Sequence, residues 1–384
     1  MLFCCVSSVL ADDSDLIIQQ ITINVPKAGT LSSKYGNSDK VKKLTNIKFT
    51  GELNLDDIKF IRELVGCNDD AEKAYDGHLQ HLDLSEVTLK NEGEPFKANG
   101  NGSEPVCFDE DGSVNYMFAY SKELQSIVLP NQMEIIGNNA FCQCDNLQNV
   151  TLPSRLKKIK YYAFGWDKKI EALSLPSTLR EIGKCAFAYS GIASIEIPSG
   201  VKNIETSTFR SCVNLSSVML HKGLEKINSS AFNFCENLTS INIPEGVKGI
   251  DRWAFEGCSN LMAVTLRPGL EYIGDQAFSD CSSLASIVIP SETGSIGSAA
   301  FKGCSNLKTV SLPSTLIYIG DNAFAECRNL TSVDLTSKIA VISERLFYNC
   351  SRLKSVKIPS NVSGIKTSAF AGCIYSLITN HNLL

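Results

Sequence analysis

A phenylalanine recurs every 23 residues through most of the chain, and this spacing constrains the fold more than any other feature. An isoleucine stands five residues before all but the first of these phenylalanines, and an alanine commonly precedes them directly. The phenylalanines are Phe118, Phe141, Phe164, Phe187, Phe209, Phe232, Phe255, Phe278, Phe301, Phe324, Phe347 and Phe370, and only the step from Phe187 to Phe209 is 22 residues. A fixed period of this length is typical of repeat proteins, in which each repeat is one structural unit that packs only against its neighbours.

Each unit also contains a short alternating segment that ends in proline, for example Leu238-x-x-Ile241-x-Ile243-Pro244. The period of two predicts a strand with one buried face, and the proline ends the strand because it has no N–H to donate. One unit alone buries about five large side chains, or roughly 10 kcal/mol. Ordering its backbone costs roughly 23 to 46 kcal/mol. The units must therefore stack as a solenoid, with a parallel β-sheet along one face and the I-x-x-x-A-F segment as a tight return path.

The unit C-x-x-L-x-x-[VI]-x-[LI]-P-x-x-[LV]-x-x-I-x-x-x-A-F-x-x resembles the leucine-rich repeat, and most closely the BspA-like class of that family. This resemblance covers roughly residues 113–375 and implies a right-handed leucine-rich-repeat coil. Two units depart from the pattern because Asp167 and Ser190 replace the cysteine, and one residue is missing before Ile192. Proteins of this class are often displayed on the surfaces of host-associated microbes. The resemblance thus implies a non-enzymatic, secreted or cell-surface protein that binds proteins and mediates attachment to host matrix or to other cells.

The remaining segments divide the chain further. Residues 1–11 (MLFCCVSSVLA) resemble the apolar part and cleavage site of a signal peptide but lack a basic start, so we expect export, with a buried first strand as the alternative. Residues 12–112 are interpreted as an irregular N-terminal capping region that contains a helix behind Asn54 and an exposed insertion over residues 90–114. Residues 113–375 form the tandem repeats, and residues 376–384 are a tail.

The cysteines of the repeat share one register, which predicts an internal ladder in which each thiol bonds a neighbouring backbone carbonyl. Disulfides are the alternative, but in-register side chains point in parallel and cannot all pair. The ladder residues are Cys144, Cys212, Cys235, Cys258, Cys281, Cys304, Cys327, Cys350 and Cys373. Thiols strung along a line do not converge on one point as zinc ligands must, so we expect no metal and no cofactor.

Other chemical signals are weak. The sequence has no nucleophile elbow, phosphate-binding loop or dinucleotide-binding motif, so we expect no catalytic residues. The acidic segment Asp109 to Gly112 has some calcium-loop character, but an exposed turn is the simpler interpretation. The net charge of −5 disfavours nucleic acid as a partner, and no stretch is long and apolar enough to cross a membrane.

Outward-facing strand positions form a flat strip that is rich in hydroxyl groups and poor in charges and aromatic rings. We expect this strip to bind a protein or glycoconjugate, although small hydroxyl residues also suit close strand packing without any ligand. The candidate residues are Ser240, Asn242, Thr265, Ser286, Val288, Thr309, Ser311, Ser332, Asp334, Ser355 and Lys357. We expect a monomer. The alternative function is a structural or scaffolding repeat protein in the cell or its envelope, and an enzyme lacks any supporting motif.

Overall fold

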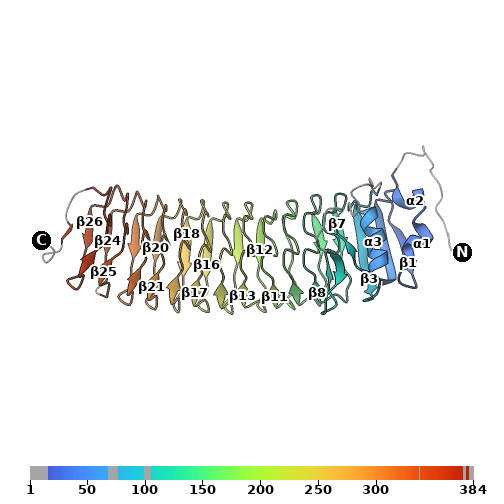
Figure 1. Cartoon of the computed structure of the whole chain (residues 1–384), viewed down its shortest axis with the longest axis horizontal. Helices are drawn as coiled ribbons and strands as arrows, with labels where there is room; N and C mark the ends of the chain where they lie inside the picture. The colour runs from blue at the N-terminus through green and yellow to red at the C-terminus, as the bar shows by residue number, and fades with distance from the viewer. Residues whose placement is uncertain (1–15, 68–76, 99–104, 337, 375–377, 380–384) are drawn as a thin grey trace.

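The computed structural model describes residues 16–67, 77–98, 105–336, 338–374 and 378–379, so the expected signal segment and most of the tail lie outside the described residues. The chain forms an elongated parallel β-solenoid, with its coils following one another along the molecule from the N-terminal to the C-terminal end (Figure 1). The predicted repeat solenoid is confirmed.

The alternating segments form the front sheet, a row of parallel strands that pair with their neighbours in several separate stretches. Residues 23 apart are direct partners, as in the pairs Ser240 with Ala263 and Ser286 with Thr309. The strands are β7 Ser126–Val128, β9 Asn149–Thr151, β12 Ser194–Glu196, β14 Ser217–Met219, β16 Ser240–Ile243, β18 Ala263–Leu266, β20 Ser286–Val288, β22 Thr309–Ser311, β24 Ser332–Asp334 and β26 Ser355–Lys357. The strand β28 (Ile378–Thr379) continues this sheet beside β26.

The expectation of a single sheet is incomplete, because a second row of parallel strands, which pair in three separate stretches, covers the opposite side of the coils. We call it the back sheet. Each of its strands consists of two residues: the core isoleucine that begins the predicted return path, and the outward-facing residue just before it. Its strands are β8 Ile135–Ile136, β10 Lys158–Ile159, β11 Glu181–Ile182, β13 Asn203–Ile204, β15 Lys226–Ile227, β17 Gly249–Ile250, β19 Tyr272–Ile273, β21 Ser295–Ile296, β23 Tyr318–Ile319, β25 Val341–Ile342 and β27 Gly364–Ile365. Two residues are too few to show a period of two, so the sequence pattern did not reveal them.

The repeated phenylalanine sits at the centre of a tight turn, which we call the Phe arch. The residues two before and two after it have left-handed backbone angles, for example φ 57° at Ser230 and 56° at Phe234 around Phe232. The N–H groups of these three residues donate to carbonyls of the next coil, at 3.0 Å to Arg252, 2.8 Å to Ala254 and 2.7 Å to Glu256. The arch therefore joins the coils through a third hydrogen-bond ladder.

The core runs without a break along the solenoid. From Phe141 to Phe370 the phenylalanine rings stack with centroids 5.2–5.8 Å apart and planes within 17° of parallel. Isoleucine and leucine columns from both sheets pack beside this stack. Each coil thus buries its apolar face only by contact with its neighbours, as the repeat energetics require.

One coil is a residue shorter than the others, at the position that the sequence indicated. The bridge between Ala172 and Ser194 spans 22 residues, whereas the neighbouring pair Ser194 and Ser217 spans 23. The shortened turn contains Gly191, whose N–H donates to the Asp167 carbonyl at 3.0 Å. A Cβ atom on Gly191 would lie only 2.0 Å from the Lys168 carbonyl oxygen. The shorter turn is therefore possible only with glycine.

The N-terminal region continues the front sheet in the order β1-β2-β3-β7, through β1 Ile21–Val25, β2 Asn46–Leu53 and β3 His81–Leu89. Two short helices, α1 Leu31–Tyr35 and α2 Asp39–Lys42, lie between β1 and β2. The helix expected behind Asn54 is α3 Leu55–Leu64, and Asn54 forms a capping box with Asp57. Arg62 of α3 is fully buried and donates to the carbonyls of Ala98 at 2.7 Å and Tyr116 at 2.6 Å.

The insertion expected over residues 90–114 is more ordered than the sequence suggested. It carries the antiparallel strands β4 Phe96–Lys97, β5 Pro105–Phe108 and β6 Val114–Asn115. Val106 and Val114 are buried in the continuous core. The description of this segment as simply exposed is therefore wrong for these two valines.

Candidate binding surfaces

The front strip, which we define as the eleven candidate residues named above from Ser240 to Lys357, lies on the outer face of the front sheet. All eleven side chains are exposed, while the residues between them, such as Ile241 and Val333, point into the core. Strand pairing places Asn242 beside Thr265 and Asp334 beside Lys357. The structure thus brings these residues together as two parallel columns of mostly small polar side chains.

A shallow hollow of about 880 Å³ extends the front face toward the N-terminal end of the strip. Its lining includes Glu196, Met219, His221 and Asn242, beside several serines. The Met219 side chain is 64% exposed there. His221, which replaces the proline of the repeat, bonds the Val201 carbonyl through Nε2 at 2.8 Å and accepts from the Gly223 N–H through Nδ1 at 3.0 Å. The sequence analysis did not predict this hollow.

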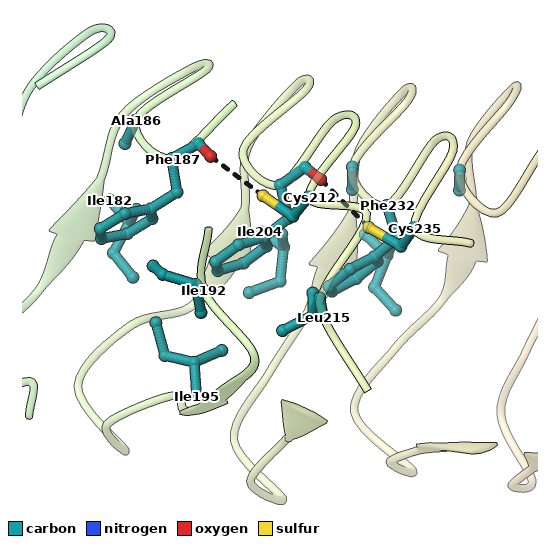
Figure 2. Close-up of a cluster of buried hydrophobic side chains, with 14 of the residues drawn as sticks. Ile182, Ala186, Phe187, Ile192, Ile195, Ile204, Cys212, Leu215, Phe232 and Cys235 are labelled. Atoms are coloured by element: carbon teal, nitrogen blue, oxygen red, sulfur yellow. Dashed lines mark hydrogen bonds between the residues drawn. The ribbon is translucent and has the colours of Figure 1, made fainter. Parts of the chain in front are cut away.

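The cysteine column lies inside the solenoid. Each of the nine cysteines donates its thiol to the carbonyl of the arch phenylalanine in the preceding coil, with Sγ–O distances of 3.0–3.2 Å, and Figure 2 shows two of these bonds, from Cys212 and Cys235. None of the nine forms a disulfide in the described structure. Burial raises the pKa of Cys212 to about 12 and raises the pKa of the other eight thiols as well. Such thiols are poor nucleophiles and poor metal ligands at neutral pH.

The acidic turn that had some calcium-loop character is neutralised by a lysine from the repeats. Lys160 is only 8% exposed, and its Nζ lies 2.7 Å from Asp109 Oδ2, 2.6 Å from Asp111 Oδ2 and 3.0 Å from Ser113 Oγ. The hydrogen bond from Lys160 lowers the pKa of Asp109. An ammonium group therefore holds the position that a metal ion would need, and no metal-binding cluster occurs among the described residues.

The Nδ1 atom of His81 lies 2.8 Å from Ser126 Oγ, on the neighbouring strand of the front sheet. No described helix is long and apolar enough to cross a membrane.

The back sheet carries a surface that sequence reasoning missed. In each coil two outward residues precede the core isoleucine, and in the first half of the solenoid most of them are charged. They form ion pairs between coils, such as Lys157–Glu134 at 2.7 Å and Lys158–Glu181 at 3.0 Å. Toward the C-terminal end the same positions become uncharged, and several of them are apolar. We define the back patch as Tyr272, Gly294, Ser295, Ile317, Tyr318, Ala340, Val341, Ser363 and Gly364.

Comparison with known proteins agrees with this architecture. The family model described as the BspA type leucine rich repeat region matches residues 114–198, 180–292 and 271–383, in 6 copies. No curated protein matches the sequence.

Solved structures of bacterial repeat proteins are similar to this chain. A leucine-rich repeat protein from Bacteroides ovatus is 27% identical, with a TM-score of 0.54 over 68% of this chain and 80% of that one. A leucine rich cell surface protein from Faecalibacterium prausnitzii is 25% identical, with a TM-score of 0.48 over 73% of this chain and 93% of that one. The family model covers well over half of the sequence. The chain belongs to the BspA-type leucine-rich repeat family.

Proposed function

We propose that this chain is a non-enzymatic, exported leucine-rich-repeat protein that acts at the cell surface or outside the cell. The front strip binds a protein or glycoconjugate and so attaches the molecule to a host matrix or to another cell. Membership of the BspA-type family supports a binding role, since solenoids of this family are typically non-enzymatic. The proposal also agrees with the absence of any catalytic motif in the sequence.

The observation that carries this proposal is the shape and chemistry of the front strip. Its six strands, from β16 to β26, are spaced by about 4.8 Å and give a surface about 24 Å long that presents side chains on a rigid backbone. Hydroxyl and amide groups on such a surface can exchange water for hydrogen bonds with a polar partner at little cost in desolvation. A flat, extended surface suits a macromolecule better than a small ligand, which needs a concave pocket.

The proposal is tested by measuring binding of the purified, fluorescently labelled chain to arrays of immobilised extracellular matrix proteins and glycans. We expect saturable binding to at least one member, and an affinity loss of about tenfold or more when Thr265→Glu and Ser311→Glu are combined, because two carboxylates then protrude from the strip. Ser351→Glu is the matched control, since Ser351 is also exposed but lies in a turn outside the strip. Failure to bind any member, or equal loss with the control variant, would contradict the proposal.

A further inference from the structure

The back patch is unusual because it is free of charge on a sheet that is otherwise strongly charged. From Gly294 to Gly364, none of the outward positions before the core isoleucines carries a charge. Within it, Ile317 is 63% exposed, Tyr318 is 52% exposed and Val341 is 42% exposed. Clustered exposure of large apolar and tyrosine side chains on adjacent strands is typical of a protein–protein contact rather than of bare surface.

The patch has a regular relief of large and small side chains. Along the strands β19, β21, β23, β25 and β27, the residue before the core isoleucine is Tyr272, Ser295, Tyr318, Val341 and Gly364 in turn. The residue preceding each of the last four is Gly294, Ile317, Ala340 and Ser363. Backbone hydrogen bonds hold the first three coils of this column in register, at 2.8 Å from Gly294 N–H to Glu271 and 2.9 Å from Ile317 N–H to Gly294. The strands β25 and β27 pair with each other but, among the described residues, not with β23. The protruding pair Ile317 and Tyr318 therefore lies directly beside the low pair Gly294 and Ser295.

We propose that the back patch binds a second copy of this chain, with the two solenoids packed back to back and running in opposite directions. The two-fold axis of this dimer runs parallel to the strands, midway between β21 and β23. Rotation about this axis reverses the order of the coils, so each column of residues in one copy faces the same column in the other copy. Ile317 and Tyr318 of one copy then lie over Gly294 and Ser295 of the other, and Tyr272 lies over Val341. At the centre of the patch, the large side chains of each copy therefore fit the small positions of its mate, and at its edge two apolar side chains, Tyr272 and Val341, meet.

Coil spacing and charge both favour a second copy over an unrelated partner. The two solenoids have the same spacing of about 4.8 Å, so the match at one coil repeats at the next, which a surface of different spacing cannot achieve. At the edge of the back patch, where charged residues begin again, Glu271 of one copy faces Ala340 of the other, and Lys248 faces Ser363. Like charges therefore do not meet across the interface. Lys248 and Glu271 remain within 4.0 Å of each other in their own chain.

Sedimentation velocity of the full chain over a range of concentrations tests this interface. The patch spans only five coils, so we expect a weak dimer, populated at about 100 µM and dissociated at about 1 µM. Combining Ile317→Lys with Tyr318→Lys should raise the dissociation constant at least about tenfold, because four ammonium groups would then meet across the axis. The matched control combines Val288→Lys with Thr309→Lys on the front sheet and should dimerise as the unaltered chain does. Thermal melts of both variants show whether the fold is kept.

Disulfide trapping tests the direction of the packing. A chain with Glu271→Cys and another with Ala340→Cys should cross-link on mixing and mild oxidation, whereas neither should cross-link with itself. An unaltered chain that stays monomeric at all concentrations would overturn the proposal. So would dimerisation that resists the back-patch lysines, dimerisation that is lost equally with the front-sheet lysines, or efficient cross-linking of either cysteine variant alone.

Discussion

The carbonyl group of each arch phenylalanine explains why cysteine follows it by three residues. The oxygen of Phe232 accepts the N–H of Cys235 in its own coil at 3.1 Å and the thiol of Cys258 in the next coil at 3.2 Å. Both acceptor sites of a buried carbonyl are thereby used. A thiol is small and nearly apolar, so it fills the core while supplying this one donor.

We expect the ladder thiols to resist modification while the chain is folded. At pH 8, iodoacetamide should alkylate the half-buried Cys107, Cys185 and Cys373 first and leave the eight fully buried ladder thiols unmodified. The reason is twofold, because those eight are shielded and their raised pKa values keep them protonated. In denaturant all nine ladder thiols should react, as measured by peptide mass spectrometry. Rapid labelling of the folded ladder, or a mass deficit from disulfides, would disagree with this account.

Asp167 shows what happens when the ladder loses its cysteine. Its side chain is fully buried, and Oδ1 accepts the Cys144 N–H at 2.8 Å. Oδ2 has no hydrogen-bond partner among the described residues. Burial raises the pKa of Asp167 well above its ordinary value, so the folded state holds a proton more tightly than the unfolded chain does.

Asp167→Cys should therefore stabilise the solenoid in a pH-dependent way. The raised pKa means that the contribution of Asp167 to stability is present below about pH 3.9 and is lost as the pH rises through the pKa of the folded state. The advantage of the variant should grow from pH 4 to pH 7.5, where we expect about 1–3 kcal/mol in the free energy of unfolding. Urea denaturation at both pH values measures it, with the exposed Glu236→Gln as the control. An equal advantage at both pH values would contradict the assignment.

Among the structural elements, the Phe arch depends on two left-handed residues in every coil. Glycine occupies the second of these positions at Gly257, Gly303 and Gly372, but most coils place a residue with a side chain there. A left-handed angle costs such a residue about 1 kcal/mol, and the ladder of hydrogen bonds between arches offsets this cost.

Substitutions at Gln143, whose φ is 59° and whose side chain is exposed, test the arch. Gln143→Gly should leave stability unchanged or raise it by up to about 1 kcal/mol, because glycine adopts this angle without strain. Gln143→Val should lower stability by about 1–3 kcal/mol, because a β-branched residue is strained there. Gln148→Val, at an exposed site with an ordinary angle, should change it by less than about 0.5 kcal/mol. Equal effects of the two valines in chemical denaturation would refute the role of the angle.

The antiparallel sheet β4-β5-β6 is held to the repeats by the cluster around Lys160. Lys160→Met should cost about 1–3 kcal/mol, because Asp109 and Asp111 lose a shared and largely buried cation. We expect the loop after β5 to become sensitive to protease before the rest of the chain unfolds. Lys158→Met is the matched control, since the pair Lys158–Glu181 is exposed and should contribute less than about 1 kcal/mol. Unchanged protease resistance in the Lys160 variant would show that the cluster does not hold this sheet.

Over the whole molecule, the 23-residue period allowed the buried columns of side chains to be predicted from the sequence. Features whose residue types differ from coil to coil were missed. The columns of Phe232, Ile227 and Cys235 could be predicted because each must meet its own equivalent in the next coil. The front strip followed from alternation along strands such as β16. The left-handed positions escaped notice because Ser230, Phe234 and their equivalents share no residue type. The back patch appears only when equivalent outward positions, such as Lys226 and Tyr318, are compared between coils.

This division has a functional meaning, because the core repeats while the two faces vary. Packing fixes the buried columns in every coil, whereas outward positions can change without disturbing the stack. The front sheet is mostly polar and uncharged, and the back sheet is charged in one half and apolar in the other. A solenoid of this kind can therefore carry two independent contacts, one for an external partner and one for a second copy.

The location of the chain on intact cells decides whether it can act in attachment, because attachment requires that the front strip face the outside. Living cells that express the native chain would be treated briefly with protease, and the released peptides identified by mass spectrometry beside those of a cytosolic marker. We expect peptides from the repeats, together with a mature chain that begins at Asp12 in the surface or extracellular fraction. Repeat peptides that appear only after lysis, with the marker and with Met1 retained, would contradict it and favour an intracellular scaffold.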